Sequence, residues 1–256
     1  MIKGKKGLII GIANDHSIAW GIAKKLHQNG ADLAITYQNS TLLKRVKPLA
    51  DSVKCKCLVQ CDVSKEEDIG NTLNIVKEKF GNIDFIIHAV AYSDKNELNG
   101  RYIETSKNNF INSLSISCYS FTKIAKVFQP IINKNGSLIT LSFYGANKVM
   151  PNYNVMGVAK AALETSVKYL SVDLGEQNIR VNAISAGPMR TLAGAAIANA
   201  REVFKYTNEN SSLKRNVSLD ELGNSALYLV SEMSAAVTGE IHYVDCGFNI
   251  VGMPRS

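Results

Sequence analysis

Two residues with acid–base chemistry, Tyr153 and Lys160, stand seven positions apart in the stretch that begins at Pro151. On a helix, seven positions make nearly two turns, so both side chains share a face, with Cα atoms about 10.5 Å apart along the axis. A phenol, with a pKa normally about 10, can donate a hydrogen bond to a developing oxyanion. An ammonium on a long stem can reach the hydroxyls of a bound ribose. The alternative is a tyrosine and a lysine that share a face by coincidence, so the surrounding elements must decide.

The chain alternates strand-like and helix-like segments throughout. Short, nearly continuous apolar runs predict strands at 7–11, 33–37, 56–60, 83–88, 137–141, 180–185 and 240–244. Among the helices between them, the first should be capped by Ser17 and end at Gly30, and another should run over about 108–132. This alternation implies a mostly parallel sheet covered on both faces. We expect one α/β domain over residues 1–256, a Rossmann-like doubly wound sheet of about seven parallel strands.

Composition limits the classes of function. With 256 residues, 46% hydrophobic and 20% charged, the chain is typical of a globular protein. The apolar run after the basic start stops at Asn14, too short for a signal peptide or a membrane span, so we expect a cytoplasmic protein without membrane contact. The net charge of +7 is spread along the chain, which argues against nucleic acid as a partner. The five cysteines lack metal-site spacing, so free thiols and no metal are expected.

Several residues at expected strand ends suit a dinucleotide, because ligands of open parallel sheets bind beyond the carboxyl ends of the strands. Gly11 closes the first strand, and the loop after it leads to a helix N-terminus that suits a pyrophosphate, although the glycine pattern is incomplete. Gln38 follows the second strand and can bond sugar oxygens. Asp62 and Val63 follow the third and would suit an adenine, unless Asp62 is an ordinary helix cap.

Two further strand ends have small or sharply turning residues. Val90 follows the fourth strand, where small neighbours let backbone approach a ligand, while His88 is expected to be a core histidine. After the sixth strand, Pro188 forces a sharp exit that would place Met189 and Thr191 near a nicotinamide carboxamide. The small, uncharged residues that follow predict either a plain helix or a mobile flap over an apolar substrate, at about 191–206.

Together these residues resemble the bacterial enoyl-acyl-carrier-protein reductases, a branch of the short-chain dehydrogenase/reductase family, over nearly the whole chain. The stretches most specific to this branch are 151–160, with its Tyr-x6-Lys pattern, and 185–192. The resemblance implies an oxidoreductase of fatty-acid biosynthesis that transfers hydride from NADH to the β-carbon of a trans-2-enoyl thioester on acyl carrier protein. It also implies a homotetramer.

The same resemblance implies roles for individual residues. Tyr153 would stabilise the enolate, Lys160 would hold the nicotinamide ribose, and Ser93 with Tyr153 would contact the substrate. The other cofactor-binding residues that it implies are Gly11, Ser17, Ile18, Gln38, Asp62, Val63, Val90, Met189, Arg190, Thr191, Leu192 and Ala193.

The chain departs from the family at two positions. Phe143 stands where the family usually has a second tyrosine, and we do not expect the neighbouring Tyr144 to replace it; Cys246 stands where glycine is more common. Two alternatives to the enoyl reductase stay open, a non-catalytic dinucleotide-binding protein and a carbonyl reductase of the same fold. The second needs a lysine four positions after the tyrosine and a serine near the pair, whereas Met156 and Gly157 stand three and four positions after Tyr153 and Phe143 holds the expected place of the serine.

Two surfaces suggest partners. Arg201 and Lys205 lie four positions apart just after the small-residue run 193–200, with Lys214 and Arg215 close behind. They would suit an acidic carrier protein unless they form an ordinary solvated face. The apolar tail 248–253 would be exposed in a monomer, so burial against a symmetry-related copy is expected.

Overall fold

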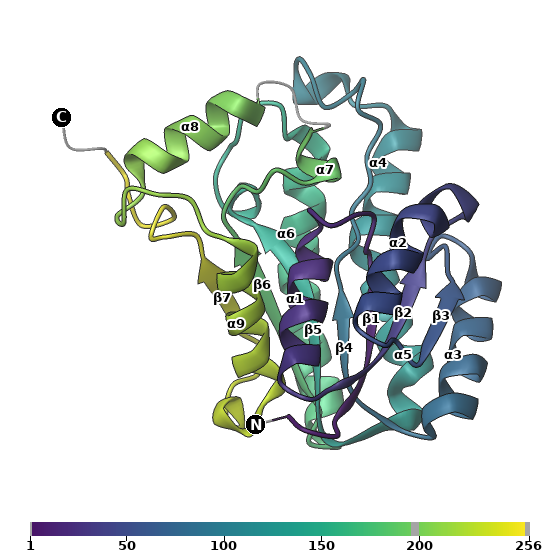
Figure 1. Ribbon diagram of the computed structural model, residues 1–256. Helices are drawn as coiled ribbons and strands as arrows, with labels where there is room; N and C mark the ends of the chain where they lie inside the picture. Colours follow the sequence, from purple (N-terminus) through teal and green to yellow (C-terminus); the bar gives the residue numbers. More distant parts are fainter. Residues whose placement is uncertain (1, 196–199, 254–256) are drawn as a thin grey trace.

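A single parallel sheet forms the centre of the computed structural model, which describes residues 2–195 and 200–253 (Figure 1). Its strands lie in the order β3-β2-β1-β4-β5-β6-β7, and every neighbouring pair is parallel. Their bounds are β1 (Lys6–Ile10), β2 (Asp32–Tyr37), β3 (Cys57–Gln60), β4 (Ile83–His88), β5 (Ile132–Phe143), β6 (Arg180–Ala186) and β7 (Ile241–Val244). The order reverses between β1 and β4, which is where such sheets bind ligands. The expected Rossmann-like fold is confirmed.

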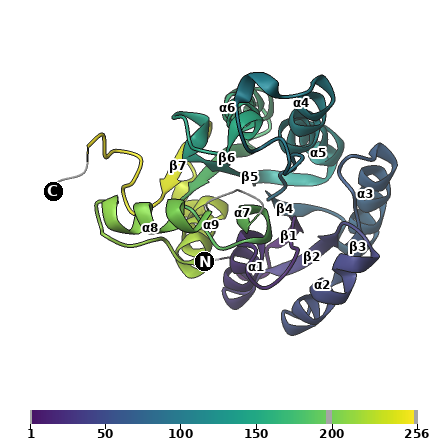
Figure 2. The same cartoon turned by 90° about the horizontal axis from the view of Figure 1, so that it is seen from above.

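Helices cover both faces of the sheet (Figures 1 and 2). One face carries α1 (Ile18–Gln28), α2 (Ser40–Ser52) and α9 (Leu219–Val230). The other carries α3 (Glu66–Phe80), α4 (Lys107–Leu114), α5 (Ser120–Phe128) and α6 (Asn154–Gly175). Above the carboxyl ends of the strands lie α7 (Leu192–Ala195) and α8 (Ala200–Asn210). No helix in the described ranges is both long and apolar enough to cross a bilayer.

The core consists of two apolar layers, one on each side of the sheet. Alternate residues of each strand point to opposite layers, so Ile9 packs with α1 and α9 whereas Leu8 packs with α3, α5 and α6. Because both layers are buried, the strands are apolar at nearly every position.

The expected long helix over 108–132 is interrupted. After α4 the chain forms a π-helical turn, Ser115–Tyr119, then α5, and the short 3-10 turn Gln129–Ile131 contains Pro130. Proline lacks an N–H and disfavours helix before it, so the helix ends at Phe128 and β5 begins at Ile132, five residues earlier than predicted. Other 3-10 turns are Tyr102–Glu104, Tyr144–Ala146 and Glu232–Ser234.

Within the segment expected to form a flap, 191–206, residues 192–195 form α7 and residues 200–206 form the start of α8. Residues 196–199 lie outside the described residues.

Candidate active site

A strained turn presents Tyr153 at the carboxyl end of β5. Tyr153 is the N-cap residue of α6 rather than a residue inside the helix, and Lys160 lies two turns along. Asn152 and Asn154 on either side have φ of 58° and 37°. Asparagine tolerates this left-handed region better than most residues, which explains the Asn-Tyr-Asn sequence. Gly145 lies against the ring, since a Cβ there would be 2.5 Å from Tyr153 Cδ1.

The Tyr153 side chain is buried among apolar groups. It is 8% exposed and packs with Leu98 and Met156, and the Phe143 ring meets it edge-on at 5.1 Å between centroids. Burial, with a smaller contribution from the negative charge of Glu164, raises the pKa of Tyr153 well above its ordinary value of 10. The hydroxyl is therefore protonated at neutral pH and can donate a hydrogen bond.

Lys160 is buried close to this turn. Its Nζ donates to Leu141 O at 2.7 Å, and an ammonium has three donors in all. Burial lowers the pKa of Lys160 to about 8, against the opposing effects of Cys118 and Glu164. Lys160 is consequently a cation at neutral pH that loses its charge in mild alkali.

The loop after β1 is shaped by two close contacts. Gly11 has φ of 107°, and a Cβ there would lie 2.1 Å from Ala89 O, so no other residue fits without movement. Ser17 precedes α1 and Ile18 begins it. Ser17 is the N-cap residue, as expected, but its side chain makes no cap hydrogen bond; its Oγ accepts from Ala13 N at 3.0 Å and Asn14 N at 3.1 Å.

Because Ser17 faces the loop, the first N–H groups of α1 have no side-chain cap and can receive an anion. A hollow of about 360 Å³ adjoins this loop and is lined by Asn14, Asp15, Arg45 and Leu49. The loop thus fits the pyrophosphate of a dinucleotide.

A polar pair lies beyond the ends of β2 and β3. Gln38 Nε2 donates to Asp62 Oδ2 at 3.4 Å, and Ser64 N and Oγ donate to Asp62 Oδ1 at 3.0 and 2.7 Å. Asp62 is not the cap of α3, which is Lys65. Burial would raise the pKa of Asp62, but the hydrogen bonds from Ser64 and Gln38 outweigh it and the pKa is lowered. A negative charge therefore stands beside Gln38, while Val63 packs at the edge of the core.

The other predicted site residues follow β4 and β6. Val90 is half-buried, and the Ser93 hydroxyl exchanges hydrogen bonds with the Asn109 amide at 3.2 and 3.1 Å. Thr191 N donates to Met189 O at 2.8 Å, which makes a tight turn before Leu192 and Ala193 at the start of α7.

Arg190 joins this turn to α8. Its guanidinium lies 4.6 Å above the centre of the Phe204 ring. All the predicted site residues thus lie at the carboxyl edge of the sheet, on the loops after β1 to β4 and β6 and around the start of α6.

His88 is confirmed as a core histidine. It is fully buried, with Nδ1 3.0 Å from Thr140 Oγ1 and Nε2 2.8 Å from Ser120 Oγ. Burial lowers its pKa to about 3, so the ring is neutral.

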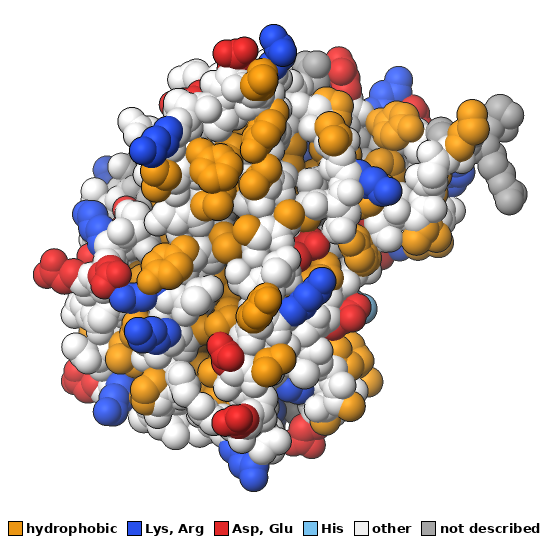
Figure 3. Space-filling view, turned by 180° about the vertical axis from the view of Figure 1, so that it is seen from behind, with side chains coloured by type: hydrophobic (Ala, Val, Ile, Leu, Met, Phe, Trp, Pro, Cys, Tyr) orange, Lys and Arg blue, Asp and Glu red, His pale blue; other side chains and the backbone are white. Residues whose placement is uncertain are grey.

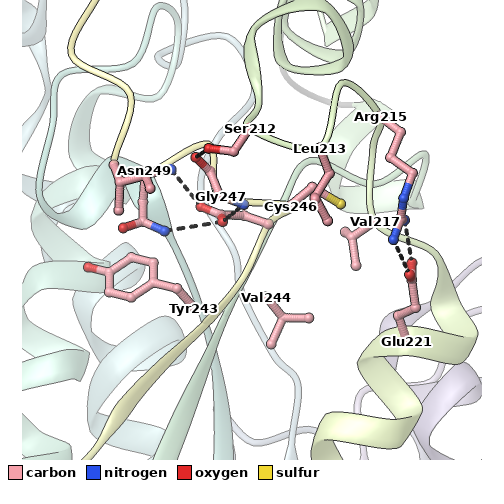
Figure 4. A pocket seen from close by; sticks show the side chains of 12 residues that line it. Ser212, Leu213, Arg215, Val217, Glu221, Tyr243, Val244, Cys246, Gly247 and Asn249 are labelled. Carbon is pink, nitrogen blue, oxygen red and sulfur yellow. Dashed lines mark hydrogen bonds and ion pairs between the residues drawn. The ribbon is translucent and has the colours of Figure 1, made fainter.

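The two departures from the family have different surroundings. Tyr144 packs edge-on against Phe248 at 5.5 Å, whereas Phe143 contacts Tyr153. Cys246 lines a hollow of about 420 Å³ at the end of β7, beside Leu213 (Figure 4). Its φ of 58° lies in the left-handed region, which glycine adopts most readily. Neither this hollow nor the one at the β1 loop is lined by Tyr153 or Lys160.

Sequence reasoning missed one buried charge beside the pair. Glu164 is 8% exposed and accepts hydrogen bonds from Ser142 Oγ at 2.5 Å and Asn147 Nδ2 at 3.0 Å. The signal was available, because Glu164 follows Lys160 by four positions and therefore shares its helix face.

Comparisons with known proteins agree with this geometry. The family model described as Enoyl-(Acyl carrier protein) reductase matches residues 11–249. The chain is 55% identical to enoyl-acyl-carrier-protein reductase (NADH) 2 of Rhizobium meliloti over 99% of this chain and 95% of that protein. It is 53% identical to enoyl-acyl-carrier-protein reductase (NADH) FabI of Rickettsia typhi over 100% and 98% of the two chains.

A solved structure is similar in both fold and sequence. The Anaplasma phagocytophilum enoyl-acyl-carrier-protein reductase in complex with NAD superimposes with a TM-score of 0.94 at 54% identity, covering 99% of this chain and 95% of that one. On the family match, the full-length identity and the shared fold, the chain belongs to the enoyl-acyl-carrier-protein reductase family.

Proposed function

We propose that this protein reduces the carbon–carbon double bond of trans-2-enoyl-acyl-carrier-protein thioesters with NADH, at the end of each fatty-acid elongation cycle. The observation that carries the proposal is the buried, protonated Tyr153 at the start of α6, with the buried, cationic Lys160 two helical turns along. Mixing the protein with NADH and a crotonyl thioester should cause loss of the nicotinamide absorbance. Oxidation of NADH by a 3-ketoacyl thioester instead would favour a carbonyl reductase, and no reaction with either would favour a non-catalytic binding protein.

Bound NADH supplies the hydride that reaches the β-carbon of the substrate. Negative charge then builds on the thioester oxygen as an enolate, and the Tyr153 hydroxyl donates a hydrogen bond to that oxygen before the α-carbon is protonated. The raised pKa suits this role, because the phenol is a donor throughout the neutral range.

Lys160 and the strand-end loops would hold the cofactor. The ammonium would bond the hydroxyls of the nicotinamide ribose and add positive potential. The loop from Gly11 to Ile18 would hold the pyrophosphate, Gln38, Asp62 and Val63 the adenosine, and Val90 with residues 189–193 the nicotinamide. Ser93 would contact the substrate, under a flap formed by about residues 191–206.

We expect a lower KM for NADH than for NADPH. The Asp62 carboxylate beside Gln38 would repel a 2′-phosphate, and the neutral Gln38 cannot form an ion pair with one as an arginine would. Asp62→Asn should reduce the ratio of the KM for NADPH to the KM for NADH by roughly threefold to tenfold. A partly screened interaction between two charges is worth about 0.6–1.4 kcal/mol. Steady-state KM values for both cofactors test this. A lower KM for NADPH in the unmodified protein would contradict it and would point to Lys44 or Arg45.

An acidic acyl carrier protein should dock beside α8. Arg201 and Lys205 are exposed there, and Lys205 makes a long contact with Glu209, at 3.8 Å. Arg215 is less available to an acidic partner, because Glu221 pairs with both of its terminal nitrogens at 2.6 and 2.9 Å (Figure 4). The Lys214 ammonium donates a hydrogen bond to Glu209 O at 3.0 Å.

Arg201→Glu combined with Lys205→Glu should therefore raise KM for the carrier-protein substrate by roughly tenfold at low salt and less at high salt, because exposed charges act through association and are screened. Turnover of crotonyl-CoA should stay nearly unchanged. Lys77→Glu with Lys79→Glu, on α3 at the opposite side of the molecule, is the matched control (Figure 1). Equal loss on both substrates would mean that the flap was damaged, and no loss would place docking elsewhere.

A homotetramer would cover two exposed apolar regions. In the tail, Ile250 and Met253 are 75% and 88% exposed. On the face opposite the view of Figure 1, apolar side chains gather over the helical layer (Figure 3). Exposed members on α4, the π-helical turn and α6 are Ile111, Tyr119, Tyr169 and Val172. Light scattering at micromolar concentration should give four times the 27.9 kDa chain mass, and a monomeric mass would contradict the assembly.

A cytoplasmic location, without nucleic acid or membrane as partners, completes the proposal. It is supported by the five free cysteines, a state that a reducing compartment maintains.

A further inference from the structure

A buried carboxylate is held in place one helical turn beyond Lys160. Ser142 and Asn147 each bond one oxygen of Glu164, and Asn147 Nδ2 also donates to Tyr243 OH at 3.0 Å. A buried charge is costly unless its polar atoms are bonded. This network thus fixes a negative charge on the α6 face that carries Lys160.

Three hydroxyls lie in a row beneath Glu164. Ser142 on β5, Ser185 on β6 and Tyr243 on β7 are in register, so they point to the same face of the sheet. Ser142 bonds Glu164 directly and Tyr243 is linked through Asn147. Ser185 Oγ is buried and, within the described part of the chain, has no hydrogen-bond partner. Ser142 and Ser185 therefore differ in their contact with Glu164, although both are buried serines in adjacent strands.

Two titratable groups favour the charged form of Lys160, Cys118 and Glu164, and Glu164 is the carboxylate that the hydrogen bonds above hold in place. The groups that interact with Lys160 from the packed elements are His88 on β4, Cys118 on the π-helical turn and Glu164 on α6, and Tyr153 precedes it by seven positions on α6. His88 and Tyr153 are neutral at physiological pH because burial disfavours their charged forms.

Charged and titratable groups on the remaining elements around α6 are engaged elsewhere. Arg180 on β6 bonds Ser231 and Ser234, and Tyr144 packs against Phe248. Lys123 on α5 pairs with Glu66, and Lys107 and Lys126 are exposed.

We propose that Glu164 is a positioning residue that holds Lys160 in its ammonium form and thereby sets the upper pH limit of NADH binding. Residues four apart on a helix are neighbours on one face, and the charged ends of Lys160 and Glu164 bond adjacent residues of β5, Leu141 and Ser142. An opposite charge within about 4–6 Å raises a lysine pKa by roughly one unit or more. Burial alone would bring the pKa of Lys160 further down than about 8. The proposal rests on the role of Lys160 in cofactor binding given above.

The direction of the pH effect depends on which protonation state of Lys160 binds NADH. If the ammonium holds the ribose, NADH affinity is complete below the pKa of Lys160 and is lost as the pH rises through it. Glu164 raises that pKa, so it extends binding to higher pH.

The test is the Kd of NADH, measured by fluorescence between about pH 6.5 and pH 9.5. Glu164→Gln keeps the shape of the side chain and removes its charge, so the midpoint of the pH profile should fall by about one unit. Its Kd should then exceed that of the unmodified protein by about eightfold near pH 8.5 and differ little near pH 6.5. Glu164→Asp keeps the charge, so the midpoint of its pH profile should lie close to that of the unmodified protein.

A merely structural role for Glu164 has a different signature. It would lower Tm, or weaken NADH binding by the same factor at every pH, and either result with an unmoved midpoint overturns the proposal. Should Glu164→Gln fail to fold, Ser142→Ala is compared with Ser185→Ala. Only Ser142→Ala frees the carboxylate to turn away, so it alone should lower the midpoint, and identical midpoints would overturn the proposal.

Lys160→Met separates this inference from the proposed function. It should bind NADH weakly and without the pH dependence. If it binds as tightly as the unmodified protein, the role of Lys160 is wrong. If it binds weakly while Glu164→Gln keeps the normal midpoint, only the role of Glu164 is wrong.

Discussion

Replacing Tyr153 with phenylalanine should lower kcat by about 100-fold or more while leaving the Kd of NADH almost unchanged. Loss of one oxyanion donor has an effect of this size, because the enolate oxygen would then face an apolar ring in a buried site. Phe143, which replaces the family's other tyrosine, has no hydroxyl to substitute. Stopped-flow single turnover with an enoyl thioester, alongside NADH titration, measures the two quantities separately.

Tyr144→Phe is the matched control for this substitution. It removes a hydroxyl from the neighbouring tyrosine, whose ring packs on Phe248 rather than on Tyr153. Its kcat should be close to that of the unmodified protein. A large loss in Tyr144→Phe with little loss in Tyr153→Phe would assign the donor to Tyr144 and refute the assignment made here.

Replacing Lys160 with methionine should weaken NADH binding by roughly 10-fold to 100-fold, the range for losing hydrogen bonds to a charged group. Methionine fills similar volume without a donor. Lys168→Met, two turns further along α6 and exposed, controls for a lysine lost from the same helix. Identical cofactor defects in the Tyr153 and Lys160 variants, with no separate chemical defect, would contradict their division of roles.

The stability of the Lys160 variant should separate function from folding. Burial lowers the pKa of Lys160 from 10.5 to about 8, so the unfolded chain binds more protons than the folded one between these values, and the lysine's contribution to stability rises with pH across that window. Below about pH 8 the buried charge is destabilising. The methionine variant should therefore unfold at the same or a higher Tm near neutral pH, in spite of its binding defect.

Several features of this protein were determined by the sequence alone. Apolar runs of strand length separated by helical periodicity predict a doubly wound parallel sheet, because only strands buried on both faces are apolar at every position. Once that topology holds, Gly11, Gln38, Asp62 and Met189 must meet at one edge, since the carboxyl ends of parallel strands point the same way. The Tyr153–Lys160 pair and the identity of His88 as a core residue also follow from local pattern and residue type.

Only the tertiary structure decided which partner each polar side chain takes. Ser17 has the type and position of a helix cap but bonds the preceding loop, and Arg215 looks like a free cation but is neutralised by Glu221. Likewise the 108–132 segment has helical periodicity, yet it contains a π-helical turn in which Ser117 bonds the backbone of Tyr92.

The burial of Glu164 is the clearest case of a contact that the sequence pattern could not predict. Its spacing from Lys160 is visible in the sequence, but a glutamate at that spacing is usually solvated. It is buried because β5 brings Ser142, 22 positions away, and the following turn brings Asn147 to its two oxygens. Periodicity reports which face of a helix a residue occupies, whereas the free energy of a charge on that face depends on groups that only the packed sheet supplies.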